Sequence, residues 1–374
     1  MATTPLRIPI NNVLMGNDYT GKLYVGSQQK EVNLLLDTGS STLAVEHKSY
    51  NPQHDTKAAV TDLVQYVKYG SGSWVGSVVK TEVKVKAGGH AADLLGVALA
   101  VAYHESANMF GKSQGILGLA YAPLDDALTL TRPTVPPTYT FNDIHAGHRT
   151  SVEPYFMQLE QAGLVANKFA FYTRRSWIHA SDNPASDPFN NGWLILGGGE
   201  EATDLYTGPF QTATVLSDDW YSVNLKQIIV GNGAPIPVLP TTHNDPSPTN
   251  AIVDSGTNGL DLDPALFDAI VAQLPQSQKA LLRSGDTANS NINLSQWPTL
   301  TFVLQGHAGD VKLLVKPENY WQLDAIESGR AISSLWRGSD KQSVLGLPLM
   351  NGYFTIFDCS ANHGLGVVKF AAIK

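Results

Sequence analysis

Two aspartates stand in near-identical surroundings in the two halves of this 374-residue chain. Asp37 ends the apolar run in VNLLLDTGSSTLAV and Asp254 ends the run in TNAIVDSGTNGLDL, and each is followed by a small hydroxyl residue, a glycine and a second hydroxyl residue. A second motif comes 81 residues after Asp37 at Gly118, in SQGILGLA, and 92 residues after Asp254 at Gly346, in KQSVLGLP. Two motifs in the same order at comparable spacing predict two related lobes.

Related lobes would bring Asp37 and Asp254 together at their interface. Two carboxyl groups in contact do not both ionise readily, so they share one proton. One of them then acts as a base and the other as an acid in the same step. Such a pair can deprotonate a water that attacks an amide carbonyl, while the protonated partner donates to the carbonyl oxygen. The pattern therefore predicts peptide hydrolysis with Asp37 and Asp254 as the catalytic residues.

The residues that follow each aspartate fit a supporting role. Glycines let the backbone approach the carboxyl groups without a Cβ, and their N–H groups can donate to them. A second hydroxyl can donate to the outer carboxylate oxygen, and the first can bond across the lobe interface and fix the geometry. The glycines are Gly39 and Gly256, the second hydroxyl residues are Ser40 and Thr257, and the first hydroxyl residues are Thr38 and Ser255.

Short β-branched and aromatic runs between Gly, Pro, Asn and Asp clusters predict a mainly β protein. The clearest runs are KLYVG, EVNLLLD, SWVGSVVKTEVKVKAGG, NKFAFYTR, NGWLILGGG, YSVNLKQIIVGNG, TLTFVLQG, KLLVKP and GYFTIFD. Alternation in SVVKTEVKVKA predicts a hairpin arm with one solvent-exposed face. Helices are expected over 152–164, over 263–274 with Asp263 as N-cap and Pro264 at the first position, and as a short turn over 276–282. Pro- and Thr-rich stretches predict long surface loops at 122–150 and 232–250.

These motifs together resemble the pepsin-like family of aspartic peptidases. DYTGKLYVG is similar to the first hairpin of that family, NGWLILGGGEE to the strand that leads to the lobe crossover, and VKYGSGSWVG to its flap. The resemblance implies an all-β, bilobal fold with two pseudo-twofold related β-lobes. The N-terminal lobe, 1–200, would carry Asp37 and the flap, and the C-terminal lobe, 201–374, would carry Asp254. The flap hairpin would close over substrate with Tyr69, Gly70 and Ser71 at its tip.

The resemblance implies an aspartic endopeptidase that cleaves between bulky apolar residues of an extended chain and works best at acid pH. It implies peptide or protein substrates, pepstatin-type inhibitors, a monomer, and no metal or organic cofactor. A non-catalytic peptide- or protein-binding protein on the same fold is the alternative. Such proteins usually lose a catalytic aspartate, the flap tyrosine or the glycines, and this chain keeps all of them.

One departure from the family pattern falls next to the first aspartate. The family typically places a tryptophan directly after the apolar residue that follows this motif, where it bonds the flap tyrosine. Here the apolar residue is Leu43 and the next is Ala44. The flap tyrosine is therefore expected to lack its usual partner, which affects the flap position and the adjoining subsite but not the proton chemistry.

Composition excludes several other classes. The net charge is −8 and no Lys/Arg-rich run occurs, which disfavours nucleic-acid binding. The longest apolar window, Leu94 to Tyr103, is too short to span a bilayer, so no membrane partner is expected. The histidines lack an HExxH-like spacing, which disfavours a metal site.

The compartment follows from weaker signals. The single cysteine, Cys359, allows no intrachain disulfide and is expected to be buried and inert. The N-terminus lacks a basic start followed by an apolar segment, and Asp37 comes too early to leave room for a propeptide. The chain in this respect resembles the prosegment-less bacterial pepsin homologues. A cytoplasmic location is expected, with a secreted mature form as the alternative.

Overall fold

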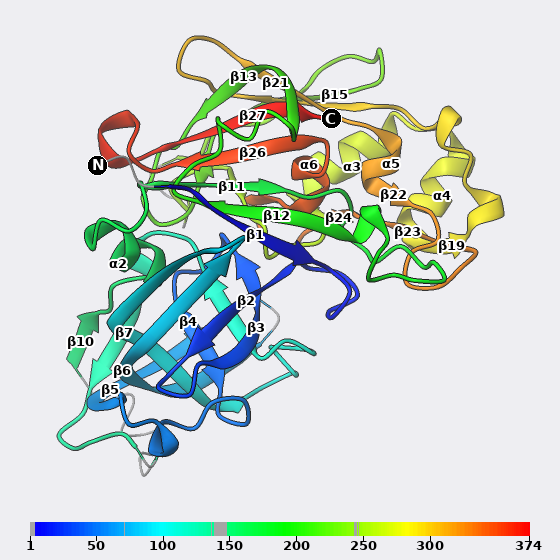
Figure 1. The fold of residues 1–374 in the computed structure, drawn as a ribbon. Helices are drawn as coiled ribbons and strands as arrows, with labels where there is room; N and C mark the ends of the chain where they lie inside the picture. The colour runs from blue at the N-terminus through cyan, green and yellow to red at the C-terminus, as the bar shows by residue number, and fades with distance from the viewer. Residues whose placement is uncertain (1–3, 71, 136, 138–147, 243–244, 246) are drawn as a thin grey trace.

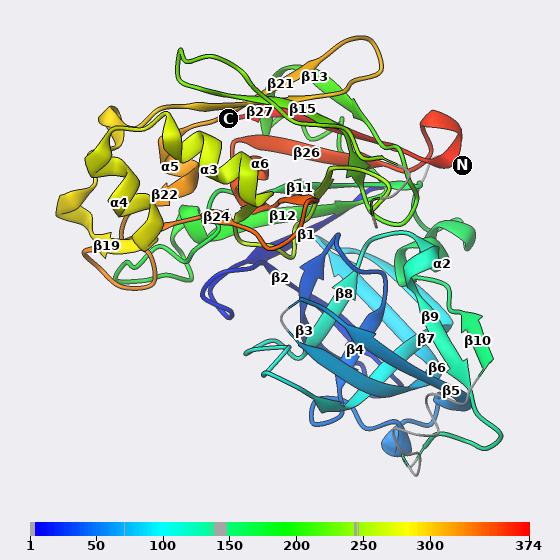
Figure 2. The ribbon, with the colours of Figure 1, turned by 180° about the vertical axis from the view of Figure 1, so that it is seen from behind.

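The computed structural model describes residues 4–70, 72–135, 137, 148–242, 245 and 247–374. The chain forms two β-rich lobes, as the sequence predicts, and strands from both ends of the chain run side by side across the middle of the molecule (Figures 1 and 2). Ser71 of the predicted flap, and much of the loop predicted over 122–150, lie outside the described residues.

The largest sheet links the two lobes and has fifteen strands among the described residues. In their order across it, these are β10 (His148–Ser151), β9 (Asp126–Thr129), β5 (Ala59–Lys68), β6 (Ser73–Ala87), β7 (His90–Glu105), β4 (Leu43–Glu46), β8 (Gly115–Gly118), β3 (Lys30–Asp37), β2 (Thr20–Val25), β1 (Leu6–Asn11), β12 (Asn191–Leu196), β11 (Lys168–Tyr172), β26 (Tyr353–Asp358), β27 (Val367–Ile373) and β13 (Tyr206–Thr214). The sheet passes without a break from β11 to β26, so the lobe boundary at residue 200 stays a prediction.

The C-terminal lobe adds three smaller sheets. The first contains β14 (Ser222–Val223), β17 (Ala251–Val253), β25 (Ser343–Leu345), β18 (Leu260–Leu262) and β24 (Leu335–Arg337); the second contains β16 (Ile236–Pro237), β15 (Leu225–Val230), β20 (Leu300–Leu304) and β21 (Val311–Val315); the third contains β19 (Asp286–Ala288), β23 (Arg330–Ser333) and β22 (Trp321–Gln322). The first of these sheets carries the second aspartate motif.

The helices are few and short. The α-helices are α2 (Tyr155–Gln161), α3 (Pro264–Ala272), α4 (Gln276–Ser284), α5 (Pro317–Tyr320) and α6 (Leu347–Met350), and the 3₁₀ turns are η1 (Pro52–His54), η2 (Ala122–Leu124), η3 (Pro188–Asn190), η4 (Asn289–Asn291), η5 (Leu294–Gln296) and η6 (Asn362–Gly364). The predicted start of α3 is confirmed, because the Asp263 carboxylate accepts hydrogen bonds from the N–H groups of Ala265 and Leu266. Helices α3, α4 and α5 lie together at one end of the C-terminal lobe (Figure 1).

The internal repeat corresponds to two similar strand arrangements. In the first lobe, β3 runs parallel to β8 with Asp37 opposite Gly118. In the second, β17 runs parallel to β25, which ends one residue before Gly346. A Cβ on Gly118 would lie 2.4 Å from the backbone of Ser41, and one on Gly346 would lie 2.1 Å from a backbone oxygen of the Asp254 loop. Glycine is needed at both positions because the backbone of the aspartate loop passes there.

Two local predictions differ from the structure. Strand β6 does not keep one wet face, because Val78 and Val79 are both buried and a register shift between Thr81 and Val83 breaks the alternation. The bulge turns Glu82 inward, where Lys57 pairs with it. The stretch 122–150, expected to be a loop, also contributes β9 and β10 to the edge of the large sheet. No helix among the described residues is long and apolar enough to cross a membrane.

Aromatic side chains fill the core where the two lobes join. The rings of Phe169 on β11 and Phe357 on β26 stack with their centroids 5.0 Å apart, and Tyr221 packs against Phe357 at 4.5 Å. The Tyr221 hydroxyl donates to the carbonyl of Leu119, one residue past the end of the β3–β8 pair. The first motif is thus anchored to the shared sheet by packing and by a buried hydrogen bond.

Candidate active site

The two aspartates occupy matching positions with matching hydrogen bonds. Asp37 ends β3 and is 5% exposed, and Asp254 follows β17 and is 8% exposed. The N–H of Gly39 donates to Asp37 Oδ1 at 2.7 Å, and the N–H of Gly256 donates to Asp254 Oδ1 at 2.8 Å. The second hydroxyl of each motif, Ser40 or Thr257, donates to Oδ2 of its own aspartate. Each lobe therefore holds its carboxylate in the same way.

The carboxyl groups also face each other across the interface. A Cβ on Gly256 would lie 2.3 Å from Asp37 Oδ1, and a Cβ on Gly39 would lie 2.8 Å from Asp254 Oδ1. Real Cβ atoms do not approach that closely, so each glycine makes room for the carboxyl group of the opposite lobe. The structure thus brings together the two aspartates that the repeat predicts.

A reciprocal set of bonds ties the two loops together. The N–H of Thr38 donates to the Ser255 hydroxyl at 3.0 Å, and the N–H of Ser255 donates to the Thr38 hydroxyl at 2.8 Å. The Thr38 hydroxyl in turn donates to the Val253 carbonyl, and the Ser255 hydroxyl donates to the Leu36 carbonyl. Val253 and Leu36 directly precede Asp254 and Asp37. Because these groups are buried and satisfied, the relative position of the two aspartates is fixed. Sequence reasoning missed a further tie, in which the Trp220 indole donates to the Gly39 carbonyl at 3.0 Å.

Burial and proximity change the acidity of the pair. Removal from water raises the pKa of Asp37 well above its usual 3.8, and the charge of Asp254 raises it further. The hydrogen bonds from Ser40 and Gly39 act in the opposite direction. The net rise means that Asp37 keeps a proton at a pH where an ordinary aspartate has lost it. The pair is therefore suited to hold one proton between two carboxyl groups.

The predicted flap is the hairpin of β5 and β6. These strands pair as far as Lys68 and Ser73, and the N–H of Tyr69 donates to the Gly72 carbonyl at 2.7 Å across the turn. Tyr69 is half-buried, whereas Gly70 is exposed and has open space around it. Burial raises the pKa of Tyr69, and the charge of Asp37 adds to this rise. Tyr69 packs against a buried cluster that contains Leu35, two residues before Asp37.

Trp74 supplies the tryptophan that the sequence analysis found absent at Ala44. It is fully buried on β6, in one cluster with Ala44, Tyr69 and Phe110. A tryptophan of the flap itself therefore lies near Tyr69, and the expected loss of the usual hydrogen-bonding partner stays a prediction. The hairpin register explains why the two rings are neighbours. Trp74 pairs with Val67, and Tyr69 lies two residues beyond Val67, just past the end of β5. The indole and the Tyr69 hydroxyl make no hydrogen bond of ordinary geometry, yet Trp74 and Ser40 are close enough to act on the pKa of Tyr69.

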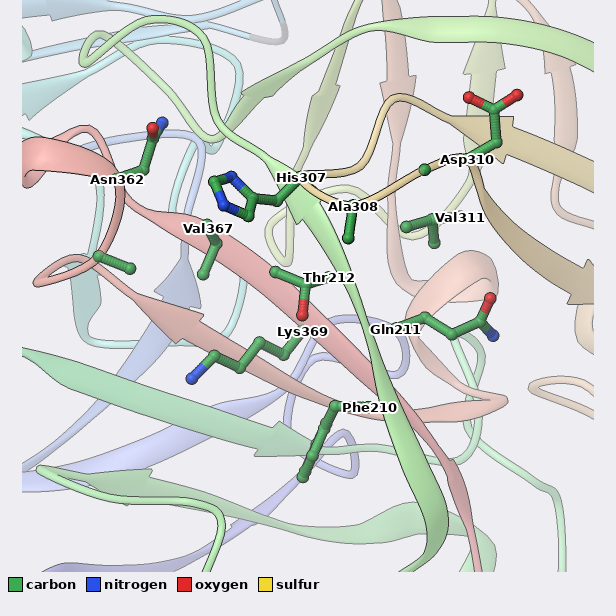
Figure 3. Close-up of a pocket in the computed structure, with 12 residues that line it drawn as sticks. Phe210, Gln211, Thr212, His307, Ala308, Asp310, Val311, Asn362, Val367 and Lys369 are labelled. Carbon is green, nitrogen blue, oxygen red and sulfur yellow. The ribbon is translucent and has the colours of Figure 1, made fainter.

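Figure 3 shows a cavity of about 510 Å³ in a different part of the molecule. Residues of β13, β27, η6 and the β20–β21 connection line it, and none of the predicted site residues is among them. Its half-buried lysine, Lys369, already pairs with Glu200 and Asp358 at 2.8 and 2.7 Å. The described residues contain no cluster of three or more His, Cys, Asp or Glu side chains arranged for a metal ion. The aspartate pair remains the best candidate site.

Comparison with known proteins gives consistent relatives. The family model described as eukaryotic aspartyl protease matches residues 18–371. A β-secretase of Strongylocentrotus purpuratus is 27% identical over 384 residues, which is 92% of this chain and 65% of that protein. Pepsin A of Rhinolophus ferrumequinum and of Bos taurus are each 24% identical over 99% of this chain, and the alignments cover 84% and 88% of those proteins. Because the family model covers nearly the whole sequence and both aspartate motifs, the chain belongs to the eukaryotic aspartyl protease family.

Proposed function

We propose that this chain is an aspartic endopeptidase that uses a water activated by Asp37 and Asp254. The observation that carries the proposal is the arrangement of these two carboxyl groups. Each is held by a glycine N–H and a hydroxyl of its own loop, and each faces the glycine of the other lobe. A purely structural turn needs no such pairing, since two facing buried carboxyl groups destabilise the fold unless they share a proton.

The mechanism follows from the shared proton. The ionised carboxylate accepts a proton from a water held between the pair, and that water attacks the amide carbonyl. The protonated carboxyl donates to the carbonyl oxygen as the tetrahedral intermediate forms. The proton taken from water then passes to the leaving nitrogen and the C–N bond breaks. A hydroxyl of the intermediate returns its proton to the other carboxylate as the new carboxyl group forms, so the pair is again singly protonated. The bonds of Thr38 and Ser255 keep this geometry fixed, so little reorganisation is needed during the reaction.

A preference for bulky apolar residues is supported by the side chains around the flap. Leu35, Phe110 and Ile116 pack with Trp74 in one cluster, and the partly buried Met109 and Tyr69 lie against it. Apolar surface beside a catalytic pair gains binding energy from apolar substrate side chains. The extended substrate would pair partly through its backbone, as strands do in other peptide-binding clefts.

We expect an acid optimum because the catalytic pair must carry a single proton, and the raised pKa of Asp37 moves the upper limit of activity toward higher pH. The active form needs one carboxyl group protonated, and the raised pKa of Asp37 preserves that proton above the usual 3.8. Activity is therefore expected to fall as the pH rises through the raised pKa, because both groups then ionise. It is also expected to fall at very low pH, where neither is ionised.

The direct test is a digest of a peptide library at several pH values, with and without a pepstatin-type inhibitor. The expected result is cleavage between apolar residues, a bell-shaped pH profile on the acid side, and loss of cleavage with the inhibitor. Inhibitor binding without cleavage at any pH would instead favour the non-catalytic peptide-binding alternative. Cleavage that resists the inhibitor and responds to chelators or serine reagents would contradict the proposal.

The flap phenol offers a smaller, separate test. The Tyr69 hydroxyl is buried and has no hydrogen-bond partner among the described residues, so it is available to bond a substrate group. Tyr69→Phe is expected to lower kcat/KM about fivefold, which corresponds to one hydrogen bond of about 1 kcal/mol. Tyr66→Phe, on the exposed side of the same strand, is the matched control. Equal rates for both variants would show that the phenol does not contact substrate.

Location and assembly are also proposals. A cytoplasmic location is supported by the single, buried Cys359, and a secreted mature form is the alternative. A monomer, as is usual in the family, is expected to elute as a single species of 40.2 kDa. The likeness to prosegment-less bacterial homologues stays a prediction, and expression of the full natural gene with mass analysis of the product would test it.

A further inference from the structure

A buried carboxyl group, that of Asp125, connects the first aspartate loop to the flap hairpin. Asp125 lies between η2 and β9 and is 1% exposed. Its Oδ1 accepts a hydrogen bond from the Thr42 hydroxyl at 2.7 Å and a second from the side-chain amide of Gln65 at 2.6 Å. Thr42 lies just before β4, at the end of the aspartate loop, and Gln65 lies on β5 of the flap. One oxygen atom therefore bonds both parts of the predicted site.

The segment that leads to Asp125 follows the aspartate loop closely. Three hydrogen bonds of 2.6 to 2.8 Å join the two: from the Leu119 N–H to the Asp37 carbonyl, from the Ala120 N–H to the Ser40 carbonyl, and from the Ser41 hydroxyl to the Tyr121 carbonyl. The bond from Thr42 to Asp125 continues this series at its far end. Asp125 is therefore held in a fixed position relative to the loop that carries the first catalytic aspartate.

On the flap, Gln65 is placed to hold the face that carries Tyr69. It is 1% exposed, and because side chains alternate along a strand it shares a face with Val67, two residues nearer the tip. Val67 and Tyr69 in turn pack against the buried cluster that contains Trp74. Gln65 directly follows the part of β5 that pairs with β9. Asp125 therefore holds the flap where the arm that bears the phenol begins.

The connection persists at acid pH. Burial raises the pKa of Asp125 to about 6, although the hydrogen bonds from Thr42 and Gln65 lower it. The carboxyl group is therefore neutral at the acid pH expected for catalysis. Its proton belongs on Oδ2, because Oδ1 already accepts two hydrogen bonds, and a neutral carboxyl group keeps its acceptor oxygen. Thr42 and Gln65 thus keep their buried bonds whether or not Asp125 is ionised.

We propose that Asp125 is a positioning residue, which fixes where the flap lies relative to the aspartate loop by bonding Thr42 and Gln65 through one oxygen. The inference rests on the proposed function, since it concerns how the flap meets substrate held at the catalytic pair. A displacement near 1 Å between reacting groups costs about 100-fold in rate, so a connection that sets this distance acts on turnover without touching substrate. Because the connection runs through a single atom, loss of either donor breaks it.

The first test removes the two donors singly and together. Thr42→Val and Gln65→Leu each delete one donor with little change in side-chain shape. Each is expected to lower kcat about tenfold and to change KM less than about threefold, because the rest of the cleft still binds substrate. The double variant is expected to match either single one, since one cut already breaks the connection. A double loss near 100-fold, or an unchanged kcat in both single variants, would overturn the inference.

Substitutions of Asp125 itself separate positioning from a general loss of stability. Asp125→Asn keeps an acceptor oxygen and is expected to retain kcat within about threefold, whereas Asp125→Ala is expected to lose about tenfold. Thr81→Val is the matched control, because it removes a threonine hydroxyl that donates to the Asp55 carboxylate elsewhere in the same lobe. It is expected to lower the melting temperature and to leave kcat unchanged. Equal kcat in Asp125→Asn and Asp125→Ala, or a loss in Thr81→Val as large as in Thr42→Val, would contradict the positioning role.

A hydrogen-exchange measurement separates this inference from the proposed function. Backbone amides of residues 65–70 are followed in the wild type, Asp125→Ala and Gln65→Leu, at a temperature below the melting transition of each protein. They are expected to exchange at least about tenfold faster in both variants, while the amides of β2 and β3 keep their rates. This result supports the Asp125 connection even if no peptide is cleaved, in which case only the proposed catalysis fails. Unchanged exchange in the flap, together with efficient cleavage by the wild type, would sink the Asp125 inference alone.

Discussion

Asp37→Asn and Asp254→Asn are each expected to lower kcat/KM by about 10⁴-fold or more, since removal of one member of a catalytic unit costs nearly as much as removal of the whole. An amide has nearly the shape of a carboxyl group but neither accepts a proton from water nor donates one as an acid. The double variant is expected to be little worse than either single one. Turnover within tenfold of the wild type in either single variant would rule out the shared-proton mechanism.

The same variants have a predicted effect on stability, with a definite sign. Because the folded-state pKa of Asp37 is raised above 3.8, the folded protein favours the protonated form. The wild type is therefore expected to lose stability as the pH rises from about 4 through the raised pKa, where burial opposes ionisation. Asp37→Asn removes this penalty, so its melting temperature should vary less with pH and exceed the wild-type value near neutrality. A melting temperature that changes with pH equally in both proteins would contradict the assigned shift.

Gly39→Ala and Gly256→Ala are the second pair of substitutions with large expected effects. The new Cβ would lie 2.8 Å from the Asp254 carboxyl group in the first variant and 2.3 Å from Asp37 Oδ1 in the second. Either contact must push the two carboxyl groups apart, and a displacement near 1 Å costs on the order of 100-fold in rate. We expect kcat to fall by at least that factor, with the larger loss in Gly256→Ala because its contact is shorter.

The measurement pairs turnover with thermal melting, so that a distorted site is distinguished from an unfolded protein. The control is Gly352→Ala, where the new Cβ would meet the flexible Asn319 side chain at 3.2 Å and the Leu314 carbonyl oxygen at an ordinary 3.9 Å. It is expected to keep near-wild-type activity. If Gly39→Ala and Gly256→Ala behave like this control, the carboxyl groups do not face the opposite glycines in the working protein.

The sequence alone determined the parts of this protein that repeat or that depend on local chemistry. The two Asp-hydroxyl-Gly motifs, together with Gly118 and Gly346, predicted two related lobes. Each lobe needs a glycine at the same point because the backbone of its aspartate loop passes there. Asp263 and Pro264 marked the start of α3 because N-cap chemistry is local. The roles of Thr38 and Ser255 could also be predicted, because residues directly after the two aspartates must lie at the lobe interface, where they bond each other.

Local patterns were least informative where a residue acts on a distant part of the chain or where a strand changes register. The bulge at Glu82 buried a position that strict alternation placed in solvent. Trp74 was not predicted because the family pattern places the tryptophan after Leu43. In this protein the β5–β6 register brings a tryptophan of the flap hairpin beside Tyr69 instead. A one-residue change in hairpin register would have turned its indole to the opposite face.

Asp18 shows most clearly what tertiary structure decided. In the sequence it is one acidic residue before a strand, with nothing to separate it from a turn aspartate. Its burial and its unpartnered oxygen arise only when the β1–β2 connection packs against residues far along the chain, such as Gly111 and Ile178. The sequence therefore determined which residues could share a proton, because that chemistry depends on residue types and on their spacing. The fold decided which other groups surround them, because desolvation and charge coupling depend on distances that no local pattern records.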